Sequence, residues 1–303
     1  MTTFDERALA RLPEVAGFTG DLRRRAFDEF GALPTPSQET EEWRYTDLSA
    51  FELTFAPFTP GGGPEAVNTH GLLQAAGAGE RAGLLVQRNS EVISTQRADD
   101  LGAKGVIFTD LDTAAAEHPD LVERYLHDLV PTKRTRFTAL HAAFRTGGTF
   151  LYVPRDTQIG LPLQTLTYVD VDGAAVFPHT LIVAEAGAEV TFIERYASPD
   201  LTRAFSDAVT EIHVGDGAHV RYAAIQDWGA GMTHLAVQRA RTGRDAEVRT
   251  LSLGFGADLA RTETEVELAE PGGFSEQLGV FFADGEQHFD HRSTQEHVAP
   301  NCS

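Results

Sequence analysis

From residue 148 onward the chain alternates apolar and polar residues with a period of two. Successive side chains of a β-strand point to opposite faces, so this period predicts strands that each bury one face. The segments concerned are TFLYVP, LQTLTYVDV, HTLIVAE, EVTFIERY, VTEIHVG, HVRYAAIQ, HLAVQRA, EVRTLSLGF, TEVELA and QLGVFFA. Helical periodicity is absent from them, and a mainly β fold is therefore predicted for this half of the chain.

The turns between these segments also repeat, at intervals of 30, 28 and 27 residues. They are GAEV at 187, GAHV at 217, DAEV at 245 and GGFSEQ at 272. A unit of about two strands cannot bury its own apolar face, so the copies must stack, which favours a β-solenoid. The side chains predicted to point inward are those of Val190, Phe192, Val220, Tyr222, Val248 and Leu251. An antiparallel sandwich or a cupin-like barrel has similar strands and turns, and is the alternative.

The first 147 residues show helices mixed with short strands. Apolar residues recur at helical spacing in FDERALARL (4–12), DLRRRAFDEF (21–30) and FTALHAAF (137–144). Short apolar runs favour strands in GLLVQ (83–87) and GVIFTDL (105–111). A flexible break is expected at GGGP (61–64). Two regions are therefore predicted, a helical and mixed α/β region over 1–147 and a β region over 148–303.

The charge of the chain excludes several classes of function. Acidic residues outnumber basic ones 45 to 25, a formal charge of −20, which repels phosphate backbones and anionic lipids. No nucleic-acid or membrane role is predicted. The chain has one cysteine and no visible signal peptide or long apolar span, so a cytoplasmic location is expected. Neither a G-x-x-x-x-G-K-[ST] loop nor a G-x-S-x-G elbow is present.

The densest group of metal-capable side chains lies in GEQHFDHRSTQEHVAPNCS, at 285–303. It contains His288, Asp290, His291, Glu296, His297 and Cys302. Imidazole, carboxylate and thiolate suit zinc or iron. On a strand, however, His288 and His291 face opposite sides, while His291 and His297 share a face six residues apart. One interpretation is a metal-dependent cupin-like enzyme that uses His288, His291, His297 and Glu296. The other is that these are ordinary hydrogen-bonded polar residues, with Cys302 an inert thiol.

The segment EEWRYTDL, at 41–48, concentrates two acids, an arginine and two large aromatic residues after the turn PTPS. Its simplest interpretation is a short amphipathic turn. Glu41 and Glu42 favour a helix N-terminus, and both Trp43 and Tyr45 are expected to be buried anchors.

Taken in order, several segments resemble the SufB/SufD family, and SufD in particular, the scaffold subunit of the Suf iron–sulfur cluster assembly machinery. They are PTP (34–36) with EEWRYTDL, FTALHAAF, GTFLYVP (148–154), LIVAE (181–185), VTFIE (190–194), TEIHVG (210–215), GAHV, GEQHFD (285–290) and HVAP (297–300). The resemblance implies a right-handed β-helix with helical ends. Within its N-terminal motif it implies structural roles for Trp43, Arg44, Tyr45 and Asp47.

The resemblance also implies a non-catalytic scaffold that pairs with SufB, while the ATPase SufC docks on helices of the full-length protein. An iron–sulfur cluster would be held transiently at a shared interface, with no cofactor bound by this chain alone. The family's later Cys/His stretch and SufC-docking helices would follow Ser303, so this chain is expected not to bind SufC. Leu278, Val280 and Phe282 are expected to lack cover, which favours a homodimer or fraying at that end.

Overall fold

The computed structural model describes residues 3–15, 17–58, 72, 76–77 and 79–303, so GGGP at 61–64 lies outside the described residues. The N-terminal region contains α1 (Glu6–Leu9), α2 (Gly17–Ala32), η1 (Glu41–Trp43), β1 (Ala56–Pro57), β2 (Gly83–Arg88), β3 (Glu91–Arg97), α4 (Asp99–Ala103), β4 (Ile107–Asp110), α5 (Leu111–Glu117), α6 (Pro119–Tyr125), η2 (Thr132–Arg134) and α7 (Arg136–Phe144). The predicted helix at 4–12 is thus shorter, and that at 21–30 longer, than the pattern indicates. No helix among the described residues is long and apolar enough to cross a membrane.

The second half of the chain consists of strands joined by turns. They are β5 (Thr149–Val153), β6 (Leu163–Tyr168), β7 (Ala174–Val176), β8 (His179–Ala184), β9 (Glu189–Ala197), β10 (Ala204–Val214), β11 (His219–Asp227), β12 (Met232–Thr242), β13 (Glu247–Gly254), β14 (Leu259–Leu268), β15 (Phe274–Phe281) and β16 (His288–His297). The mainly β prediction for this half is confirmed.

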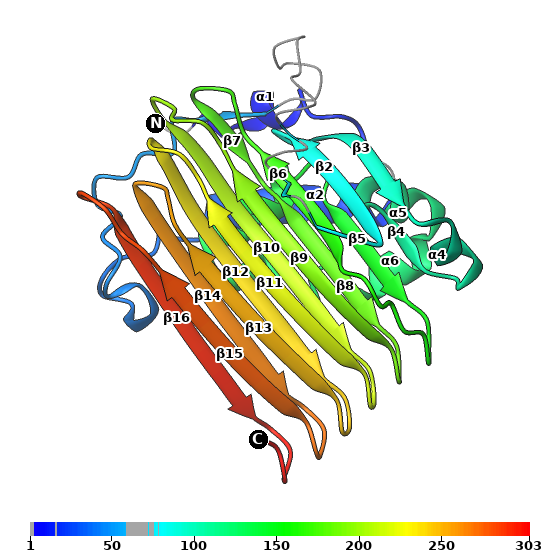
Figure 1. Ribbon diagram of the computed structural model, residues 1–303. Helices are drawn as coiled ribbons and strands as arrows, with labels where there is room; N and C mark the ends of the chain where they lie inside the picture. The colour runs from blue at the N-terminus through cyan, green and yellow to red at the C-terminus, as the bar shows by residue number, and fades with distance from the viewer. Residues whose placement is uncertain (1–2, 16, 59–71, 73–75, 78) are drawn as a thin grey trace.

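The strands form two sheets that face each other (Figure 1). Sheet A has the order β16-β14-β12-β10-β8-β5-β4, and sheet B has the order β15-β13-β11-β9-β6-β2-β3. From β8 onward the chain alternates between the sheets, and every strand pairs in parallel with the strand two positions later. This is the predicted β-solenoid. An antiparallel sandwich and a cupin-like barrel are both excluded, because neither stacks consecutive coils through parallel pairs.

The repeated turns have a conformational reason. Gly187, Gly217, Asp245 and Gly272 occupy equivalent corners with φ of 70°, 63°, 53° and 80°. Most residues with a side chain avoid this left-handed region. At Gly272 a Cβ atom would lie 1.9 Å from Asp245 Oδ1 of the preceding coil, so glycine is required there. The interval of 27 to 30 residues between these corners is therefore the length of one coil.

The interior between the sheets is apolar through most of the stack. Val190, Phe192, Val220, Tyr222 and Val248 are buried in one cluster, which confirms their predicted inward orientation. The prediction for Leu251 is wrong. Leu251 is half-buried on the outer face of sheet B. Side chains of a strand alternate between its two faces, so a residue three positions from the inward-facing Val248 points outward. Thr250 is the residue in register with Tyr222.

The outer faces of the two sheets differ. Aromatic residues of the N-terminal region, including Phe4, Trp43 and Phe144, pack against Phe177 and Phe205 on the outer face of sheet A. Helices α4 to α6 lie at the end of the stack opposite to β15 and β16 (Figure 1). Strands β2, β3 and β4 belong to the two sheets, so the sheets continue across the expected boundary between residues 147 and 148.

Candidate functional site

Part of the outer face of sheet B is apolar in its last coils, next to the ion pairs of Arg249 with Glu247 and Glu276. The strand register places Leu278 beside Leu251 and Val280 beside Leu253. Leu278 is 55% exposed and Phe282 is 67% exposed. They face outward from sheet B and not along the stack, so the expected lack of a following coil is not the reason for their exposure. Phe282 also stacks on Phe255 of the preceding coil, with ring centroids 6.0 Å apart. Exposed apolar side chains that are contiguous in this way are typical of a protein interaction surface. We call Phe255, Leu278, Val280 and Phe282 the apolar face.

Part of the interior of the same coils is polar and holds a cavity of about 90 Å³ between the two sheets. Its lining residues include Thr250, Ser252, Thr262, Thr264, Gln277, His291 and Ser293. Earlier coils carry Phe192 and Tyr222 in the column that continues to Thr250 and Gln277. The change from aromatic to hydroxyl and amide side chains leaves space that water can fill.

Strand β16 distributes the predicted metal-binding residues along its length. The register pairs His288 with Leu259 and His291 with Thr262, which confirms that the two imidazoles face opposite sides. His288 and His297 mark opposite ends of β16, roughly 30 Å apart at the rise of a strand. Among the six, only His291 lines the polar cavity, where burial lowers its pKa.

The remaining predicted ligands have other partners. Asp290 pairs with Arg261, and Glu296 lies 3.9 Å from Arg239. The thiol of Cys302 is half-buried against the solenoid core and donates to the carbonyl oxygen of Glu270 at 3.3 Å. Within the described residues these side chains do not meet at one point. The cupin-like interpretation requires a β-barrel and ligands that meet at one metal ion, and the described residues form neither.

The segment EEWRYTDL fastens the N-terminal region to the last coils of sheet A. Trp43 is 5% exposed and stacks on Phe137 of α7 at 5.5 Å. The guanidinium of Arg261, on β14, lies 4.2 Å from the centroid of the Trp43 ring and donates to the carbonyl oxygen of Glu42. Thr46 donates to Asp290 on β16. Trp43 is therefore the anchor that was predicted.

The other residues of this segment lie at the surface. Tyr45 is 71% exposed, so its prediction as a second anchor is wrong. Residues two positions apart in a helical turn point in different directions, and burial of Trp43 leaves Tyr45 in solvent. Arg44 is exposed near Glu41 at 3.8 Å. The Asp47 carboxylate accepts from the backbone N–H of Ser49, and this bond lowers the pKa of Asp47.

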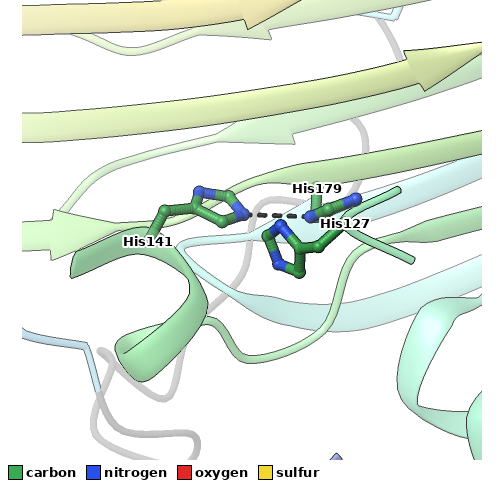
Figure 2. Close-up of side chains that lie close together, drawn as sticks. All are labelled: His127, His141 and His179. Carbon is green, nitrogen blue, oxygen red and sulfur yellow. Dashed lines mark hydrogen bonds between the residues drawn. The ribbon is translucent and has the colours of Figure 1, made fainter. Parts of the chain in front are cut away.

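A buried histidine cluster lies under α7 on the outer face of sheet A, and sequence reasoning missed it. It consists of His127 from the loop after α6, His141 from α7 and His179 from β8 (Figure 2). Each ring offers one nitrogen, and these three atoms lie within 4.8 Å of one another. No other group of three or more such ligands was found among the described residues. The one signal in the sequence is a histidine amid the apolar residues of FTALHAAF.

The side chain of Glu211, on β10, holds this cluster together. Its carboxylate accepts from the backbone N–H groups of His127, Leu129 and Val130 at 2.7 to 3.0 Å. It also lies 3.1 Å from Nε2 of His179. These bonds hold His127 in a left-handed conformation with φ of 61°. Burial lowers the pKa of His127 to about 4, and lowers the pKa of His141 and of His179 well below the usual 6.5.

Two family models match the chain. One, described as SUF system FeS cluster assembly, SufBD core domain, matches residues 167–303. The other, described as SufBD protein N-terminal region, matches residues 78–165. The N-terminal-region match contains helices α4 to α7 as well as strands β2 to β5, and the core-domain match includes the apolar face and the polar cavity.

Curated relatives carry the same family description. The chain is 31% identical over 285 residues to iron–sulfur cluster assembly SufBD family proteins of Staphylococcus saprophyticus, Staphylococcus epidermidis and Staphylococcus aureus. Each alignment covers 94% of this chain and 58% of the relative. The chain therefore spans somewhat more than half the length of the relatives it matches.

Proposed function

The chain belongs to the SufBD family, and on that premise we propose that it is a non-catalytic scaffold of iron–sulfur cluster assembly, of the SufD type. In this proposal it pairs with a SufB-type paralogue in the cytoplasm. Docking of the SufC ATPase is proposed for the longer protein that the relatives represent. That this chain alone fails to bind SufC stays a prediction.

The observation that carries the pairing is the apolar face. Phe255, Leu278, Val280 and Phe282 lie on the outside of sheet B, where another coil added to the stack would not bury them. Burial of apolar area contributes about 25 cal/mol per Å², so a partner that covers this face gains most from its aromatic residues. On sheet A the corresponding outer face is charged, with Arg239 and Arg241 beside Glu265 and Glu267.

The strand edges supply a second means of pairing. β15 and β16 are the outermost strands of their sheets in the described part of the chain. An outermost strand presents backbone N–H and C=O groups to a strand of another chain. A related solenoid paired in this way would extend the polar cavity across the junction.

We propose the iron–sulfur cluster as cargo held at that junction. A cluster needs about four protein ligands, mostly thiolates, and this chain has a single cysteine, so a partner would supply most of them. His288, His291, His297 and Cys302 are the candidates on this side. Their separation along β16 and the following turn allows only one or two of them to reach a single cluster.

The pairing is tested by co-expression with a SufB-type paralogue, followed by size-exclusion chromatography with light scattering. The wild-type chain is expected to elute as a heterodimer, and Phe282→Asp together with Leu278→Asp to elute alone. Ile93→Asp is the matched control, since Ile93 is 37% exposed on β3, far from β15 in the order of sheet B. Unchanged pairing of the double variant would contradict docking through the apolar face.

A further inference from the structure

In the histidine cluster, one ring nitrogen of each imidazole already faces a fixed acceptor. Nδ1 of His127 lies 3.0 Å from the carbonyl oxygen of Val130. Nδ1 of His141 lies 2.8 Å from the carbonyl oxygen of Asp207, and Nε2 of His179 lies 3.1 Å from the Glu211 carboxylate. Carbonyl and carboxylate oxygens accept hydrogen bonds, so each of these three nitrogens must carry the proton.

One nitrogen of each ring lies within 4.8 Å of those of the other two. Nε2 of His141 and Nδ1 of His179 are 3.0 Å apart (Figure 2). Nε2 of His127 is buried and has no hydrogen-bond partner among the described residues. A neutral imidazole has only one N–H, which each ring has already used. The contact between His141 and His179 therefore joins two lone pairs with no proton between them, and the lone pair of His127 Nε2 is buried without a donor.

A second proton on one ring would separate the lone pairs that face each other, but burial opposes protonation of these rings. All three imidazoles are buried, and an unpaired imidazolium in such a place is costly. A metal ion bound to the lone pairs satisfies all three nitrogens and needs no extra proton. The nearby Glu211 carboxylate would offset part of the positive charge of the metal ion. Arg145, which also lies near the cluster, has its own carboxylate partner in Asp112 at 2.8 Å.

We infer that His127, His141 and His179 bind one divalent transition-metal ion, His141 through Nε2 and His179 through Nδ1, with His127 as the third ligand. Zinc and iron(II) both accept imidazole ligands, at about 2.0–2.1 Å for zinc. Separations within 4.8 Å require only small ring movements to reach such a distance. Metal-bound histidines usually donate their other N–H to a carbonyl or carboxylate, as all three do here.

The position of the site indicates a structural role. Its ligands come from the loop after α6, from α7 and from β8, so one ion would join the N-terminal region to the first coils of the solenoid. This site is separate from β16 and from the proposed cluster cargo. The inference therefore stands or falls independently of the scaffold function.

The test measures the metal content of the 303-residue chain, expressed with added zinc, purified without a polyhistidine tag and passed through a chelating resin. We expect close to one zinc ion per chain by mass spectrometry. Metal-free protein given Co²⁺ should show the strong visible absorption of a low-symmetry nitrogen site. Its thermal midpoint should rise by several degrees on addition of Zn²⁺.

Three sets of variants locate the ion. His127→Asn, which tolerates positive φ, and His141→Asn should each reduce the zinc content to near zero. Glu211→Gln should weaken zinc binding roughly 10- to 100-fold by loosening His179. The control, His288→Gln with His291→Gln and His297→Gln, should retain the ion. If metal-free wild-type protein shows no visible absorption after addition of Co²⁺, the inference is overturned even if the variants do not fold. Loss of zinc in the control alone would also overturn it.

Discussion

At the scale of single residues, buried polar groups in this molecule are held by specific partners. The Glu194 carboxylate accepts from Thr180 at 2.7 Å, from Thr210 at 3.1 Å and from Tyr222. Burial raises the pKa of Glu194, and these hydrogen bonds oppose that rise. His234 has fewer compensating bonds, since its Nδ1 lies near Ser206 Oγ and its ring packs between aromatic residues.

His234 should make stability depend on pH. Burial, and then the nearby His291, lower the pKa of His234 from 6.5 to about 3. The unfolded chain therefore binds a proton below pH 6.5 that the folded chain excludes, so stability is complete above 6.5 and falls toward pH 3. Between pH 6.5 and 4.5 the wild type should lose about 2 kcal/mol more than His234→Phe.

The measurement is urea unfolding of both proteins across that range. His219→Phe is the control, because the His219 side chain is nearly half exposed on β11. Parallel pH profiles for the wild type and His234→Phe would show that His234 titrates normally in the folded protein.

At the scale of elements, η1 shows how a very short helix can matter. Its three residues place one large ring between α7 and the guanidinium of Arg261. Arg261 is itself buried and pairs with Glu263 and Asp290. The N-terminal segment thus contacts strands that lie more than 200 positions later in the chain. Burial of Trp43 is what holds this long-range contact.

Substitution of Trp43 should therefore be costly. Trp43→Ala removes a fully packed ring and exposes the Arg261 ion pairs, and should reduce the free energy of unfolding by about 3–5 kcal/mol. Tyr45→Ala, at an exposed position two residues away, should change it by about 0.5 kcal/mol or less. Chemical denaturation and limited proteolysis of the two variants make the comparison. Equal stability of Trp43→Ala and the wild type would mean that the ring docks a partner instead.

At the scale of the whole molecule, the outer faces of the two sheets become less covered from the first coils to the last. The first coils carry helices on the outer face of sheet A, and an apolar cluster that includes Ala76 and Leu84 on sheet B. In the last coils the interior turns polar and the outside of sheet B turns apolar. Among the described residues, the outer face of sheet B is therefore covered in the first coils and exposed in the last ones.

Amide hydrogen exchange should follow this gradient. β10 and β12 are paired on both sides and should exchange slowly, whereas β16 pairs only with β14 and should open without global unfolding. Mass-spectrometric exchange of the isolated chain measures the difference, and a SufB-type partner should protect β15 and β16. Equal protection of β12 and β16 in the isolated chain would indicate that β16 is already covered, as in a homodimer.

Local patterns in the sequence favoured the solenoid over a sandwich or a barrel, and the family resemblance pointed to the same fold. The period of two identifies the strands, and left-handed corners at Gly187, Gly217, Asp245 and Gly272 mark each coil, because both are properties of a short stretch of backbone. The same counting rule shows why Leu251 was misassigned, since parity relative to Val248 decides its face. The opposite orientations of His288 and His291 follow from that rule as well.

Only the tertiary structure decided which distant side chains meet. Trp43 and Tyr45 are both large aromatic residues of one short segment. Trp43 is an anchor because Arg261 and Phe137 lie against its ring, whereas Tyr45 is left in solvent. His127, His141 and His179 come from three separate segments, and no spacing predicts their contact. The dense metal-capable run at 285–303 is instead spread out by its own strand. Strand geometry is local and repeats, whereas a site depends on how the helices pack against the sheets.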